Sequence, residues 1–82
     1  MITKDIIKKD LKNKCLGINL KKYTHNIMYR VFCLKKYETE IKTYLENLGF
    51  RNIISYGGGG FQLKHNAELV IKGIIDKGGI NE

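Results

Sequence analysis

The stretch IMYRVFCL at positions 27–34 is the strongest indication of secondary structure in the sequence. It combines β-branched and aromatic residues, which favour strands. Its apolar character is almost continuous, and Arg30 is the polar exception. A run of this kind is typical of a central strand that is covered on both faces. We therefore predict a strand over 27–34 at the centre of a sheet, and we assign the neighbouring segments around it.

The residues before this strand predict a helix and then a hairpin. Thr3 is a good N-cap residue, and Gly17 is a natural helix stop. Between them an apolar stripe repeats every four residues, formed by Ile7, Leu11 and Cys15. The segment 18–23 alternates in character and predicts a strand that pairs with 27–34 through a turn at 24–26.

The residues after the central strand predict a helix, two strands and a last helix. Apolar residues at helical spacing indicate a helix over 37–48 that ends at Gly49. The segments 51–56 and 61–65 are predicted to be strands joined by a glycine run. Segment 66–77 has an apolar face at helical spacing and is predicted to be the third helix, in which Gly73 permits a close packing contact.

The expected architecture is a single α+β domain over residues 1–82. Three helices pack on a small, four-stranded, mainly antiparallel sheet in the order α-β-β-α-β-β-α, because this is the simplest way to bury three amphipathic helices. A winged helix is the alternative, with 37–48 as its last helix and 51–65 as its wing. That fold needs a helix-turn-helix pair, and the β-rich segment 27–34 occupies the place of its first helix.

The expected order of elements is similar to that of the half-domain of LAGLIDADG homing endonucleases, whose sheet lies in the DNA major groove. The segment KCLGIN at positions 14–19 follows the first helix and contains no acidic residue. This departure removes the metal ligand that cleavage would need at that end of the helix. The resemblance therefore implies DNA binding without cleavage, and it assigns no role to individual residues.

The charge of the chain is strongly uneven. Residues 1–42 contain eleven Lys or Arg and four Asp or Glu, whereas residues 43–82 contain four of each, so the whole net charge of +7 belongs to the first half. Such asymmetry indicates a polyanionic or acidic partner. We predict a non-enzymatic protein that contacts the phosphate backbone of DNA or RNA. The residues expected to contact phosphates are Lys8, Lys9, Lys12, Lys14, Lys21 and Lys22. Arg30 or Tyr23 is expected to contact bases.

A second hypothesis uses the same charge for a protein partner. A small regulator or inhibitor, of the kind that phages and mobile elements encode, would dock its basic side on an acidic surface or on a nucleic-acid-binding protein. The sequence leaves the oligomeric state open between a monomer and a homodimer, because the two hairpins leave sheet edges that must be covered or paired.

The remaining motifs have structural explanations. Gly57, Gly58, Gly59 and Gly60 lack the GxxxxGK[ST] phosphate-binding pattern and predict a flexible hairpin tip. The cysteines and histidines lack the paired spacing of a zinc site, so Cys15 and Cys33 are interpreted as reduced, buried thiols. The acidic residues show no close pairing for two-metal catalysis. We therefore predict no catalytic residue, no metal and no cofactor.

The sequence contains no apolar run of the ~20 residues that a membrane span requires. Its first residues alternate charge with isoleucine and do not form the apolar core of a signal peptide. We therefore expect a cytoplasmic protein that has no membrane partner.

Overall fold

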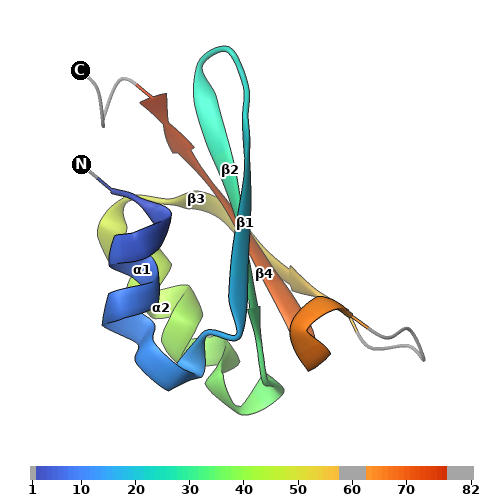
Figure 1. Cartoon of the computed structure of the whole chain (residues 1–82). Coiled ribbons are helices and arrows are strands. Elements are labelled where there is room, and N and C mark those ends of the chain that lie inside the picture. The colour runs from blue at the N-terminus through green and yellow to red at the C-terminus, as the bar shows by residue number, and fades with distance from the viewer. Residues whose placement is uncertain (1, 58–62, 78–82) are drawn as a thin grey trace.

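A computed structural model describes residues 2–57 and 63–77 of the chain. The described part is an α+β domain in which two helices cover one side of a four-stranded antiparallel sheet of order β1-β2-β4-β3 (Figure 1). The elements are α1 (Lys4–Leu11), β1 (Gly17–Lys22), β2 (Asn26–Cys33), α2 (Glu38–Leu48), β3 (Arg51–Tyr56) and β4 (Leu69–Asp76). Three short 3-10 turns, η1 (Lys12–Lys14), η2 (Lys35–Tyr37) and η3 (Lys64–Asn66), lie between them. The predicted α+β class and the four-stranded antiparallel sheet are confirmed.

The first helix begins where the sequence predicts and ends earlier. The side-chain oxygen of Thr3 accepts a hydrogen bond from the Ile6 N–H at 3.2 Å, which caps the helix. The helix ends at Leu11 because Lys12 adopts a positive φ of 49°. Cys15 is then extended, and the chain enters β1 at Gly17. Gly17 is therefore the first residue of a strand and not the stop of the helix.

The second helix agrees closely with the prediction. Gly49 ends it in the left-handed conformation, with φ of 100°, which glycine adopts without the cost that a side chain imposes. The Phe50 N–H then donates to the Leu45 carbonyl at 3.1 Å and turns the chain into β3. On the exposed side, Lys42 forms an ion pair with Glu38 at 3.3 Å.

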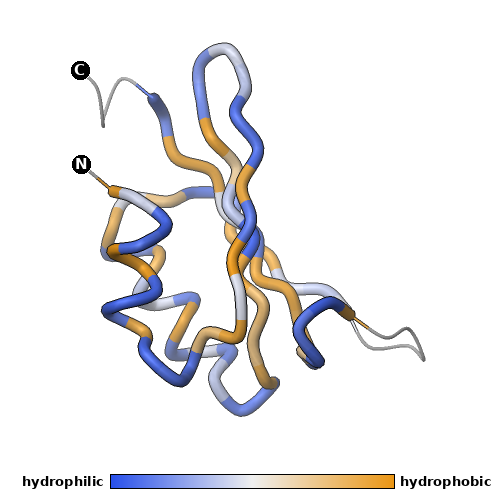
Figure 2. Tube along the Cα trace, in the orientation of Figure 1, coloured by the Kyte–Doolittle hydropathy of each residue, from blue (hydrophilic) through white to orange (hydrophobic). Residues whose placement is uncertain are grey.

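The core lies between the two helices and one face of the sheet. Alternate residues of β2 and β4 belong to it, together with apolar residues of α1 and α2. Hydrophobic residues recur along both helices and along the strands of the sheet (Figure 2). The buried members of the core are Ile7, Leu11, Ile18, Ile27, Tyr29, Val31, Cys33, Ile41, Leu45, Phe50, Ile71 and Ile75. The central position of segment 27–34 is confirmed, since β2 pairs with β1 on one side and with β4 on the other. Within residues 2–57 and 63–77, helices cover one of its faces, and not both as the sequence predicted.

The prediction of a third helix over 66–77 is wrong. Residues Leu69–Asp76 form strand β4, which pairs with both β2 and β3. The predicted fourth strand over 61–65 is also wrong where it is described, because Lys64–Asn66 form the turn η3; residues 61 and 62 lie outside the described ranges. The physical reason is the central strand: an apolar β2 needs partners on both edges, and the β-branched run before Asp76 provides the second one.

The glycine within this segment performs the function that was predicted, in a different element. A Cβ added at Gly73 would lie 3.3 Å from the Cβ of Phe50, so the missing side chain lets Phe50 pack against β4. Tyr29 contacts the same ring edge-to-face, with ring centroids 5.2 Å apart. The winged-helix alternative is not confirmed, because the β1–β2 hairpin separates α1 from α2 in the chain.

Candidate nucleic-acid interface

The side of the sheet that faces away from α1 and α2 is not covered by a helix of the described chain, and we call it the open face (Figure 1). Successive strand residues point to opposite sides, so the residues between the core positions belong to this face. Cross-strand partners extend it over all four strands. Its members include Asn19, Lys21, Met28, Arg30, Phe32, Val70, Lys72, Ile74, Ile54 and Tyr56.

Two cations occupy the middle of the open face. Arg30 of β2 is the direct cross-strand partner of Lys72 of β4, and Asn19 and Ile54 continue the same row on the outer strands. Like charges in directly opposite positions destabilise a sheet. Among the described residues, neither cation forms an ion pair; the pairs found are Lys14–Glu40, Lys42–Glu38 and Arg51–Asp76. The centre of the face thus carries uncompensated positive charge.

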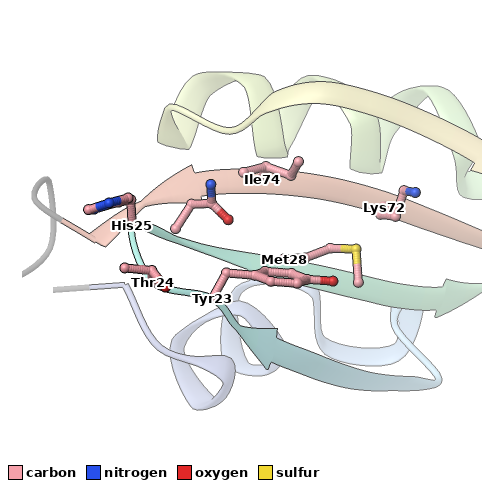
Figure 3. A pocket seen from close by; sticks show the side chains of 7 residues that line it. Tyr23, Thr24, His25, Met28, Lys72 and Ile74 are labelled. Carbon is pink, nitrogen blue, oxygen red and sulfur yellow. The ribbon is translucent and has the colours of Figure 1, made fainter.

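A cleft of about 520 Å³ adjoins these cations at the hairpin end of the face (Figure 3). It is lined by Tyr23, Thr24, His25, Asn26, Met28, Lys72 and Ile74. The Tyr23 ring lies beside Met28, and Lys72 and Ile74 project from β4 across from it. Tyr23 is 44% exposed, and the Nζ atom of Lys21 lies 5.4 Å from its ring centroid. An aromatic ring, an apolar floor and two lysines therefore meet at one place.

At the opposite end of the open face, a histidine covers a phenylalanine of β2. The His65 ring packs edge-to-face against Phe32, with centroids 5.2 Å apart. A Cβ at Gly17 would lie only 2.4 Å from the Cδ2 atom of His65, so glycine at the start of β1 makes room for this ring. Phe32 is consequently only 5% exposed although no helix covers it, and Met28 is 6% exposed. Beyond them, β3 presents Ile54 and Tyr56, which are 48% and 42% exposed.

The structure divides the predicted contact residues between two sides of the molecule. Lys21, Tyr23 and Arg30 belong to the open face or its hairpin end, and Lys22 is exposed at the end of β1. Lys8 and Lys9 lie on α1, and Lys12 and Lys14 form the turn that follows it. The structure brings Lys72 beside Arg30, and the sequence-based prediction missed it because segment 66–77 was assigned to a helix.

Two lysines of the helix layer, Lys14 and Lys42, are paired with acidic side chains of α2. Lys14 forms an ion pair with Glu40 of α2. The hydroxyl of Tyr44 donates to the Asp10 carboxylate at 2.6 Å, and burial and this carboxylate together raise the pKa of Tyr44. Lys8, Lys9 and Lys12, by contrast, form no ion pair within the described residues.

The two cysteines and the two histidines lie in different surroundings. Burial is the main cause that raises the pKa of the Cys33 thiol to about 11, and burial also raises the pKa of the half-buried Cys15 thiol. Both thiols are thus held protonated, as the predicted apolar packing requires. His25 lies in the exposed turn of the β1–β2 hairpin, whereas His65 packs on Phe32. Across residues 2–57 and 63–77, no group of three metal-ligating side chains comes together.

Of the predicted glycine loop, the structure describes the first residue. Gly57 follows β3 with a φ of 134°, a conformation that favours glycine. Gly58, Gly59 and Gly60 lie outside the described residues.

Within the described ranges, the helices are too short and too polar to cross a membrane. In comparisons with family models, curated proteins and solved structures, nothing matches this chain.

Proposed function

We propose that this protein binds nucleic acid without catalysis and that the open face contacts the phosphate backbone. The observation that supports the proposal is the cross-strand pair of Arg30 and Lys72, which has no acidic partner among the described residues. Two cations held opposite each other repel, and a bound polyanion would remove that repulsion. Lys21, on the neighbouring strand, adds a third positive charge.

The open face suits this function better than the helix layer. Proteins gain affinity for nucleic acids by replacing condensed counterions on the phosphates with lysine and arginine. Cations whose charge is already offset by carboxylates contribute less to this exchange. Lys14 is paired with Glu40, whereas Arg30 and Lys72 have no ion pair within the described structure and are held directly opposite each other on neighbouring strands. The face also lacks clustered arginines, which favours backbone contacts over the reading of guanine edges.

The salt dependence of binding tests this assignment. With three phosphate contacts, the logarithm of the affinity should fall against the logarithm of salt concentration with a slope of about −2 for single strands and about −3 for duplexes. A double variant, Arg30→Ala with Lys72→Ala, should reduce the steepness by about 1.4 to 1.8. The matched control, Lys8→Ala with Lys9→Ala, removes the same charge from α1 and should leave the slope nearly unchanged.

Fluorescence anisotropy with labelled DNA and RNA oligonucleotides provides the measurement. Absence of binding to any of them at low salt would contradict the proposal. An equal loss of slope in both double variants would contradict the assignment to the open face.

A protein partner is the second candidate function, and the exposed apolar residues of β3 favour it. Ile54 and Tyr56 lie beside the central cations on an outer strand of the sheet. An acidic protein docked there would use both the charge and the apolar surface. Poly-glutamate as a competitor separates the two functions: it should displace a nucleic acid poorly, and it should compete well if the face recognises carboxylates. Light scattering measures whether two copies of the chain pair instead.

A further inference from the structure

We infer that the cleft bounded by Tyr23, Met28 and Lys72 is a base-stacking subsite for single-stranded nucleic acid. This inference rests on the proposed function and deepens it, because it names the class of nucleic acid and the residue that receives a base.

The geometry of the cleft supports a flat aromatic occupant. Tyr23 is the last residue before the hairpin turn, and its ring borders the cleft beside Met28 (Figure 3). The floor is apolar where Met28 and Ile74 meet as direct cross-strand partners. A base placed against the Tyr23 ring would therefore exchange water for an aromatic face and an apolar floor, and stacking of this kind tolerates any base.

The charges around the cleft select an occupant that is joined to phosphates. Lys72 lines the cleft, and its cross-strand partner Arg30 lies next to Met28 along the open face. Lys21 lies on the other side, with its Nζ atom 5.4 Å from the centroid of the Tyr23 ring. A base in the cleft would thus have cations on two sides for the phosphates that flank it. An uncharged aromatic ligand would leave these cations without a partner.

The same arrangement favours a single strand over a duplex. In a duplex both faces of every base are stacked and its edges are paired, so no base is free to enter a cleft on the sheet without being unstacked, which costs a few kcal/mol. A single strand offers its bases without that cost. A cationic surface that carries exposed aromatic rings is the usual design of proteins that bind single strands.

Substitution at Tyr23 provides the test, with a labelled oligo-dT of about 12 nucleotides and the matching dT·dA duplex as probes. Base–aromatic stacking contributes enough that Tyr23→Ala should weaken oligo-dT binding about 5- to 100-fold. Tyr23→Phe, which keeps the ring, should stay within about twofold of the unsubstituted protein. Tyr56→Ala is the comparison variant: Tyr56 is similarly exposed on the same face but lies outside the cleft, so its loss should weaken oligo-dT binding clearly less than the loss of Tyr23.

The absence of tryptophan from the chain allows a direct spectroscopic readout. Tyr23→Trp places a single indole at the cleft, and stacking of a base on it should quench its fluorescence as oligo-dT is added. Tyr56→Trp should report little quenching. Circular dichroism of each variant verifies that the fold is retained.

The outcomes separate this inference from the function on which it rests. Strong loss of oligo-dT binding in Tyr23→Ala, with quenching in Tyr23→Trp, supports the subsite. If oligonucleotides bind with a salt slope that depends on Arg30 and Lys72 but Tyr23→Ala binds equally well, or the duplex binds more tightly, the subsite is wrong and the proposed function stands. If neither probe binds the unsubstituted protein at low salt, both are wrong.

Discussion

Reversing the charge of Lys72 should stabilise the fold and weaken nucleic-acid binding at the same time. In Lys72→Glu the like-charged cross-strand pair with Arg30 becomes a pair of opposite charges. Two unit charges about 6 Å apart in a water-like medium interact by about 0.7 kcal/mol. Removing the repulsion and adding the attraction therefore gives about 1.4 kcal/mol before screening, and salt and side-chain mobility reduce it to about 1 kcal/mol, the upper range of measured cross-strand pairs.

That gain is measurable in a chain of this length. For small domains, 1 kcal/mol corresponds to a change in Tm of about 4–8 °C. The rise in Tm should diminish as salt is added, since the Debye length falls to about 10 Å at 0.1 M. Thermal unfolding followed by circular dichroism at low and high salt measures both effects.

The same substitution should lower the affinity for oligonucleotides. Loss of one phosphate contact should weaken binding about tenfold or more at about 20 mM salt. Lys8→Glu changes the net charge of the protein equally from the helix layer, and it should have a much smaller effect on both quantities. A Lys72→Glu protein that melts at a lower temperature, or that binds oligonucleotides as tightly as the unsubstituted protein, would refute the reasoning.

Three further predictions concern the fold. Gly49→Ala should cost about 1–2 kcal/mol in urea unfolding, because φ is 100° there and the added Cβ meets no other atom within 4 Å, so the cost is purely conformational. Thr3→Ala should cost about 1 kcal/mol by loss of the helix cap to Ile6, and Thr3→Ser should restore most of it. The Cys33 thiol, with its pKa raised from 9.0 to about 11 by burial, should cause a loss of stability of about 2 kcal/mol as pH rises from 9 to 11. In this window the unfolded chain ionises the thiol and the folded chain does not, so a Cys33→Ala variant should show a shallower decline over the same pH range.

Three parts of the fold could be predicted from residues close together in the sequence. The Thr3 cap, the helix ending at Gly49 and the central strand each rest on a single chemical feature, namely a hydroxyl acceptor, a residue without Cβ and a run of β-branched and aromatic residues. The first helix was predicted too long because its apolar stripe continues to Cys15, whereas the backbone turns at Lys12. The apolar stripe is the same whether the helix ends at Leu11 or continues to Cys15, so the pattern did not reveal the turn at Lys12.

The apolar pattern of β4 did not distinguish a strand from a helix. The run LVIKGII at 69–75 fits a helical face, and it equally fits a strand whose alternate residues enter the core. Pairing with β2, which is distant in sequence, decides between the two. The β-branched residues and Gly73 were the signals for a strand. Since Lys72 lies in this run, the same error hid the cross-strand partner of Arg30. Lys21, Tyr23 and Arg30 lie in segments whose strand and turn positions were predicted, so their places beside one another could be expected from the sequence.

Mapping of an oligonucleotide onto the protein by NMR tests the central claim most directly. The chain is small enough for each backbone amide to be followed in ¹⁵N-labelled protein as oligo-dT is added at low salt. The shifts should concentrate on β1, β2 and β4 around Lys21, Arg30 and Lys72, with little change along α1. Shifts confined to α1 and η1, or no shifts at all, would contradict the assignment of the open face as the nucleic-acid interface.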